Sequence, residues 1–213
     1  MYDVTRMQST LDEAFFRAES EIRKEFARAL KCIYGDSKVP NKTTFGRVTI
    51  SKHKLRNHDD LNSIIDTAGF YIILTDYALD NNNCRLVANG NLRAIYRGEC
   101  HKIRKRIQSH LFNTKYKKDY EDRKRKYQSK YKGKEFHEQF WPACLKLKPG
   151  VNGINIDQPQ FKNSNWLVIV HCMNGCKQGV RKQAELAFDE LFGKPVACKE
   201  RRIEGSEGSR LHS

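Results

Sequence analysis

The sequence predicts an α+β fold, with a small three-stranded, mainly antiparallel sheet flanked by helices, an N-terminal helix and a basic helical insertion. Two apolar runs, at 69–76 and 165–173, have the length and composition of buried strands. A third strand is expected at 92–98. Around them, apolar residues recur every three or four positions, as in helices that bury one face. These segments are 9–34, 102–111 and 180–195. A chain of 213 residues suffices for one compact domain with a core.

The first 68 residues are expected to form a helical extension. Leu11, Phe15, Ile22 and Phe26 recur at near-helical spacing within 9–34, and Gly35 follows as a stop signal. The polar stretch after it contains "FGRVTIS" (45–51), which is compatible with a short strand, and "LNSIIDTA" (61–68), which is compatible with a brief helix.

The centre of the chain predicts a hairpin followed by a helix. The strands 69–76 and 92–98 are separated by a segment dense in turn-forming residues. The second strand is expected to break at Gly98, and a helix is expected to begin at Lys102. Arg106 and His110 lie one helical turn apart, beside the apolar stripe of that helix. We therefore expect both side chains to face a cleft.

Residues 112–164 are interpreted as a basic insertion. Residues 115–134 carry ten Lys or Arg against three acidic residues, a net charge of +7. Four tyrosines fall on one helical face, at steps of four, seven and four residues: Tyr116, Tyr120, Tyr127 and Tyr131. One interpretation is a helix that packs its tyrosines on the domain and leaves its charges in solvent. The other is a helix laid along a phosphate backbone, and we expect both to hold.

The last segments supply a strand, a helix and a tail. "NWLVIVHCM" (165–173) reads as a buried strand, and the helix over 180–195 ends at Gly193 and Pro195. Residues 204–213 are expected to be a flexible tail. The seven cysteines read as free thiols. The spacing in "HCMNGC" (171–176) could offer zinc ligands, but no second pair accompanies it, so we interpret Cys172 as a core residue.

The charge of the whole chain points to a polyanionic partner. The sequence has 40 Lys and Arg against 25 Asp and Glu, a formal net charge of +15, and cations that neutralise phosphates release counterions and drive binding. No apolar run is long enough to cross a bilayer. The first residues lack the regions of a signal peptide, so we expect a cytoplasmic protein without a membrane partner.

Five polar residues set into this framework suit phosphodiester hydrolysis: Tyr71, Tyr96, Arg106, His110 and Glu185. Adjacent strands can bring the two phenols together. An arginine grips phosphate oxygens through its planar fork, and a glutamate is a suitable ligand for Mg²⁺, with Mn²⁺ as an alternative. Such a hydrolase needs an activated water and a cation aimed at the charge that develops on phosphorus.

The order of these motifs resembles the GIY-YIG nuclease superfamily. "GFY" (69–71) stands for the first motif and "IYRG" (95–98) for the second, and an R-x-x-x-H pattern follows at 106–110. "AELAFDELFGKP" (184–195) is similar to the glutamate helix of that family. The two tyrosines are 25 residues apart, a long hairpin that is most like the restriction-endonuclease branch.

The resemblance implies a role for each of the five residues. Tyr71 would be the general base with Tyr96 as its support, and Arg106 would stabilise the pentacovalent phosphate. His110 would orient a phenol or share its proton, and Glu185 would be the protein ligand of one Mg²⁺ or Mn²⁺ ion. A free phenol has a pKa near 10, which Arg106 and the metal are expected to lower.

The sequence is thus interpreted as one catalytic domain over 1–203, a metal-dependent endonuclease that cuts double-stranded DNA in restriction or defence. Residues 69–111 and 165–198 would form its core, without a small-molecule cofactor. A palindromic target would favour a homodimer. The DNA contacts expected are Arg97, which replaces the usual aliphatic residue of the motif, and Lys102, Lys117, Arg123, Lys124, Arg125, Lys126, Lys130, Asn152 and Asn155. The alternative is a non-catalytic or RNA-directed nucleic-acid-binding protein with a nuclease-like fold.

Overall fold

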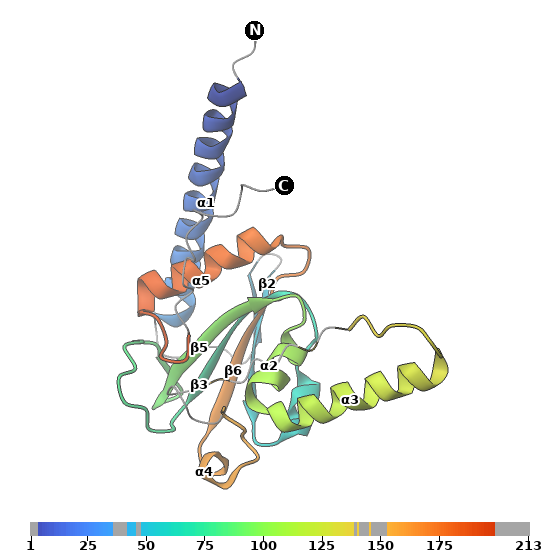
Figure 1. Ribbon diagram of the computed structural model, residues 1–213. Coiled ribbons are helices and arrows are strands. Elements are labelled where there is room, and N and C mark those ends of the chain that lie inside the picture. Colours follow the sequence, from blue (N-terminus) through green and yellow to red (C-terminus); the bar gives the residue numbers. More distant parts are fainter. Residues whose placement is uncertain are drawn as a thin grey trace.

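The computed structural model describes residues 4–35, 42–45, 48–138, 140, 145 and 153–198. Figure 1 shows the elements along the chain. In order they are α1 (Val4–Tyr34), β1 (Lys42–Phe45), β2 (Val48–Leu55), the 3₁₀ helix η1 (His58–Ser63), β3 (Gly69–Thr75), β4 (Val87–Ala88), β5 (Leu92–Cys100), α2 (Ile103–Leu111), α3 (Asn113–Lys130), α4 (Pro159–Lys162), β6 (Trp166–Cys172) and α5 (Gln178–Phe192).

The sheet has six strands, in the order β1-β2-β6-β3-β5-β4, and every neighbouring pair is antiparallel. It curls into a half-barrel. The prediction of a small three-stranded sheet is therefore wrong. The three predicted strands are its centre, β6-β3-β5, while β2 and β1 extend it on one side and β4 on the other.

The short strand expected at 45–51 overlaps β2, which continues to Leu55 and joins the main sheet. The residues of β2 are "VTISKHKL", and only Ile50 and Leu55 are buried. The strand forms because its backbone pairs with β6 along its length, from Thr49 opposite Cys172 to Leu55 opposite Trp166. Backbone hydrogen bonds to a distant segment satisfy the chain without any strong side-chain pattern. The segment expected to be a helical extension thus also supplies two strands.

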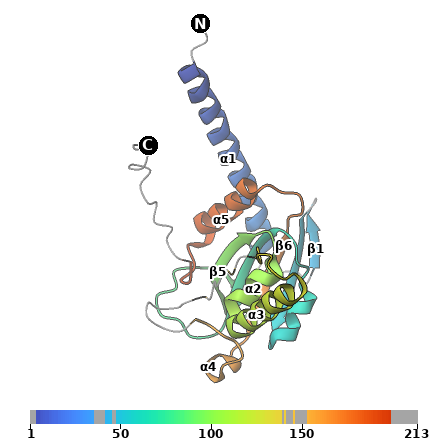
Figure 2. The ribbon, with the colours of Figure 1, turned by 45° about the vertical axis from the view of Figure 1, so that its right-hand side comes forward.

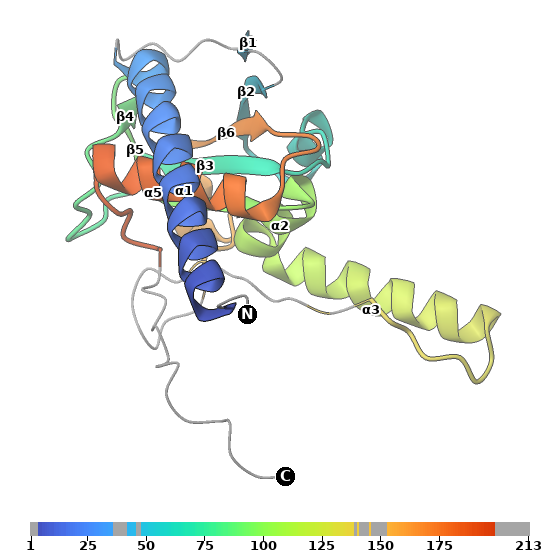
Figure 3. The same cartoon turned by 90° about the horizontal axis from the view of Figure 1, so that it is seen from above.

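Helices cover both faces of the sheet. All residues of β3 are buried, and their side chains alternate between two apolar clusters. Phe70, Ile72 and Leu74 pack under α1 and α5, which cross each other above the sheet (Figure 3). Tyr71 and Ile73 face the second layer, which includes α2 and η1.

Two helices extend beyond this body. The first half of α1 projects away from the sheet (Figures 1 and 2), and residues 7–18 are all exposed. Four large apolar side chains lie on it with exposed fractions between 50% and 70%: Met7, Leu11, Phe15 and Phe16. Helix α3 projects from another side of the molecule (Figure 3). Among the described residues, no helix is long and apolar enough to cross a membrane.

Two local predictions also need correction. The strand over 92–98 does not break at Gly98, because β5 continues to Cys100 before α2 begins at Ile103. The brief helix expected at 61–68 is a 3₁₀ turn over His58–Ser63, capped by Asn57. The predicted tail at 204–213 lies outside the described residues.

Candidate active site

Three of the five predicted residues meet on the α2 side of the sheet. The Tyr71 hydroxyl on β3 lies 2.7 Å from Nε2 of His110 on α2, and both side chains are buried. The ring of Tyr96 on β5 has its centroid 4.6 Å from that of His110 and 5.9 Å from that of Tyr71. Tyr71 and Tyr96 share a face because their strands pair, with Tyr71 opposite Gly98 and Ile73 opposite Tyr96.

The glycine of the second motif makes room for the two phenols. A Cβ atom at Gly98 would lie 2.8 Å from the Tyr71 hydroxyl oxygen and 2.8 Å from Cε1 of Tyr96. Carbon atoms in favourable contact are about 3.5–4.0 Å apart, so any larger residue would displace a ring. The close approach of these side chains, rather than a break in the strand, is therefore the reason for a glycine at this position.

Burial controls the ionisation of both phenols. It raises the pKa of Tyr71 well above its ordinary value, and the neighbouring Tyr96 acts in the same direction. Burial also raises the pKa of Tyr96 to about 12, while Arg106 works against the increase for both residues. Arg106 therefore acts in the expected direction, but desolvation outweighs its charge and the pKa of each phenol lies above its ordinary value. Both hydroxyls are protonated at neutral pH.

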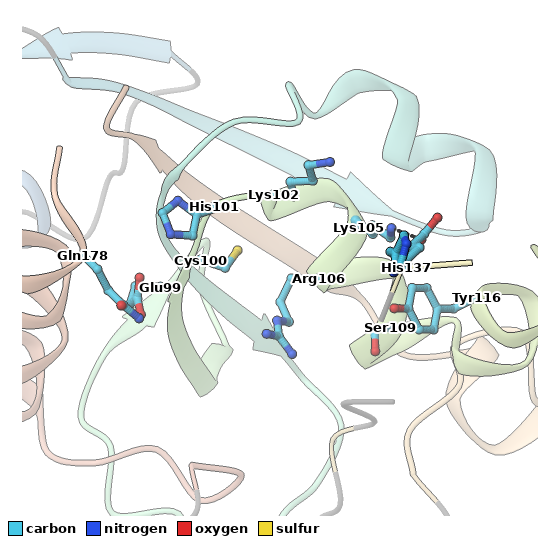
Figure 4. Close-up of a pocket in the computed structure, with 11 residues that line it drawn as sticks. Glu99, Cys100, His101, Lys102, Lys105, Arg106, Ser109, Tyr116, His137 and Gln178 are labelled. Atoms are coloured by element: carbon cyan, nitrogen blue, oxygen red, sulfur yellow. Dashed lines mark hydrogen bonds and ion pairs between the residues drawn. The ribbon is translucent and has the colours of Figure 1, made fainter. Parts of the chain in front are cut away.

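Arg106 faces a cleft with a volume of 480 Å³ on the outside of this cluster. Figure 4 shows Arg106 between Glu99 and Gln178 on one side and the residues around His137 on the other. Lys102 also lines the cleft, as does Ser109, the neighbour of His110. Neither phenol is among the lining residues, so the Tyr71–His110 pair lies behind the cleft.

Glu185 lies on α5 close enough to Tyr96 to influence its pKa. Its Oε1 atom is 3.3 Å from Nη1 of Arg97. The same guanidinium donates to both carboxylate oxygens of Asp189, at 3.0 and 2.5 Å. Burial opposes the charge of Arg97, but the two carboxylates raise its pKa above the ordinary value. Arg97, expected to contact a DNA phosphate, is thus held inside the protein by two acids.

This ion pair bears on the predicted metal site. Glu185 and Asp189 offer oxygen donors of the kind that Mg²⁺ and Mn²⁺ prefer, but the guanidinium of Arg97 already contacts both carboxylates. The part of the chain that the structure describes contains no cluster of three His, Cys, Asp or Glu that could hold a metal ion. As arranged, these residues do not fit a divalent ion, which would first have to displace Arg97.

The predicted DNA-binding residues differ in their exposure to solvent. Exposed positions on α3 include Lys117, Arg125, Lys126 and Lys130, while Arg123 and Lys124 are half-buried. Asn155 is buried, and its amide donates to Thr114, which makes it a link between the loop and α3. Asn152 lies outside the described residues.

The tyrosine stripe of α3 has partners that the sequence did not indicate. Tyr120 packs on Phe136 and Phe140, with ring centroids 5.6 and 4.8 Å away, and Tyr127 packs on Phe136. The segment that follows α3 therefore folds back along the helix. It carries Glu138 into the cleft, where Lys105 meets it. The basic run "KIRKR" (102–106) could have indicated Lys105 as a residue of the cleft, but no pattern in the sequence indicated Glu138.

Comparisons with protein-family models, with curated proteins and with solved structures gave no match. The resemblance to the GIY-YIG nucleases therefore rests on the order of the sequence motifs alone.

Proposed function

We propose that this protein is an endonuclease that hydrolyses phosphodiester bonds in double-stranded DNA. The observation that carries the proposal is the buried hydrogen bond between Tyr71 and His110, behind a cleft that Arg106 lines together with Lys102 and Lys105. A phenol, an imidazole and a guanidinium in this order can supply a base, a proton acceptor and a cation for the charge on phosphorus. A role in restriction or defence, within the cytoplasm, is part of the proposal.

The raised pKa of Tyr71 determines how the base would work. Because this pKa is well above 7, the Tyr71 side chain is a neutral phenol in the resting protein. The phenol would pass its proton to Nε2 of His110 as it takes one from the attacking water. The distance of 2.7 Å between the two atoms is suitable for that transfer. Arg106 would meanwhile contact the phosphate oxygens in the cleft, where its side chain lies. The resemblance also implies a dependence on Mg²⁺ or Mn²⁺, which cleavage assays with either ion or with a chelator test.

One observation favours a second candidate, a non-catalytic nucleic-acid-binding protein. Tyr71 is only 1% exposed, so a substrate could not reach its hydroxyl without movement of the residues that cover it. Such a protein would bind DNA or RNA through the same basic surfaces but would not cut either. Incubation with plasmid, single-stranded DNA and RNA, each with Mg²⁺ or with a chelator, separates these candidates.

A homodimer is also part of the proposal, with α1 as its contact. The four exposed apolar side chains of α1 on two copies would offer roughly 1,000 Å² of apolar area, close to a small specific interface. Most of the stability of a helix in a protein comes from tertiary packing, and a partner that covers the exposed residues 7–18 would supply it. Light scattering should give the mass of two chains for the wild type and of one for Phe15→Glu; a wild-type monomer would overturn this part.

The test of catalysis uses two buried tyrosine–histidine pairs. The Tyr34 hydroxyl lies 2.6 Å from Nε2 of His171, and this pair is on the opposite face of the sheet. Tyr71→Phe and Tyr34→Phe each remove one hydroxyl from such a pair and should cost about 1 kcal/mol of stability. Only Tyr71→Phe should lower the cleavage rate, by about 10²–10⁴-fold. Equal rates for the two variants would remove Tyr71 from catalysis.

A further inference from the structure

A single carboxylate holds two cations from different helices at one end of the cleft. Glu138 accepts hydrogen bonds from Arg123 of α3, from Nε at 3.1 Å and from Nη2 at 2.9 Å. The ammonium group of Lys105 on α2 contacts the same carboxylate. Burial opposes the charge on Glu138, but Arg123 and Lys105 together hold its pKa below the ordinary value. The acid is therefore ionised at neutral pH and neutralises part of the basic surface.

This ion pair belongs to the cleft that contains Arg106. Lys105 and Glu138 both line it, and Figure 4 shows Lys105 on the side away from Glu99. Glu99 already has partners of its own, since Nε of Arg181 donates to it at 3.0 Å. Removal of the Glu138 carboxylate would thus leave Lys105, which lines the cleft, and Arg123 beside it without this anion.

The three side chains form a geometry that also suits phosphate. A guanidinium fork with a second cation beside it binds carboxylate and phosphate oxygens alike. The side chains of Lys105, Arg123 and Glu138 are 30%, 41% and 26% exposed, so a polyanion can approach them from solvent. Ion pairs with this degree of exposure contribute little to stability, and their exchange for another anion is inexpensive.

We propose that Lys105 and Arg123 form a binding subsite for a phosphate of the DNA backbone next to Arg106, and that Glu138 occupies this subsite until DNA displaces it. The inference rests on the proposed DNA-binding function and adds a competing internal anion to it. Helix α3 then contributes to DNA binding in two ways: through its exposed lysines, and through Arg123, which Glu138 occupies in the free protein.

The test compares Glu138→Gln with Glu135→Gln, which makes the same charge change at an exposed position of the same segment. Binding of a short labelled DNA duplex is measured by fluorescence anisotropy. Glu138→Gln should lower the Kd about fivefold relative to Glu135→Gln, the upper range for one exposed ion pair. In an Arg123→Ala background, the gain from Glu138→Gln should fall to less than half.

Each other outcome overturns the inference. Equal Kd values for the two glutamine variants would mean that Glu138 does not compete with DNA. A gain that persists without Arg123 would reflect net charge alone. Weaker binding or a lower Tm for Glu138→Gln would show a purely structural contact. If neither the wild type nor any variant binds the duplex, the proposed DNA-binding function fails together with the inference. If the wild type binds and the Kd values follow one of the outcomes above, only the inference fails.

Discussion

Replacement of Gly98 by alanine tests the geometry of the candidate site most directly. The new Cβ would lie 2.8 Å from the Tyr71 hydroxyl and 2.8 Å from the Tyr96 ring, which is about 1 Å inside a favourable contact. Overpacking of a core costs about 1–3 kcal/mol, and removal of the Tyr71–His110 hydrogen bond adds about 1 kcal/mol. We therefore expect Gly98→Ala to reduce the free energy of unfolding by about 2–4 kcal/mol.

The assay is thermal unfolding, followed by cleavage of plasmid. A destabilisation of that size lowers the Tm by roughly 5–15 °C for a chain of this length. Gly179 of α5 is the matched control, because a Cβ there would meet nothing within 4 Å; Gly179→Ala should be neutral or slightly stabilising. In the proposed mechanism, cleavage by Gly98→Ala falls at least as far as in Tyr71→Phe. If the two alanine variants melt together, the phenols are not packed against Gly98.

Three further predictions concern other parts of the molecule. Burial lowers the pKa of His171 to about 3, whereas the pKa in the unfolded chain is near 6.5. The contribution of His171 to stability is therefore complete above pH 6.5 and falls toward pH 3, with a decrease of about 2 kcal/mol between pH 7 and pH 5. Denaturant titrations across this pH range should show a weaker pH dependence for His171→Gln than for the wild type. Arg97→Ala leaves the carboxylates of Glu185 and Asp189 without their cation and should cost about 3 kcal/mol. Mn²⁺ should then raise the Tm of this variant more than that of the wild type, and an equal rise would show that Arg97 does not occupy the cation position. Alanine at 124–126 should weaken binding to all DNA sequences alike and flatten the salt dependence by roughly one unit of slope for each phosphate that the helix no longer neutralises, whereas an unchanged slope would mean that this part of α3 does not contact DNA.

The local pattern of the sequence was sufficient for most helices and for the central strands. Strands β3 and β6 are nearly continuous apolar runs, because both faces of the centre of the sheet are covered, whereas β5 is interrupted by Arg93, Arg97 and Glu99. The grouping of Tyr71, Tyr96 and His110 could be expected from the same pattern. Two paired strands and the helix that follows them leave few places for three side chains on one face.

The tertiary structure decided what depends on partners distant in sequence. Strand β2 is formed by backbone pairing with β6, and this pairing leaves little trace in the pattern of its side chains. The sequence alone indicates that Arg97 is a surface cation, whereas in the folded protein Glu185 and Asp189 of α5 contact it. The ionisation of Tyr71 and the position of Glu138 in the cleft follow from burial and from the return of the segment after α3. Short-range order is encoded by neighbouring residues, whereas charge partners and desolvation are set by contacts that form only when the whole chain has folded.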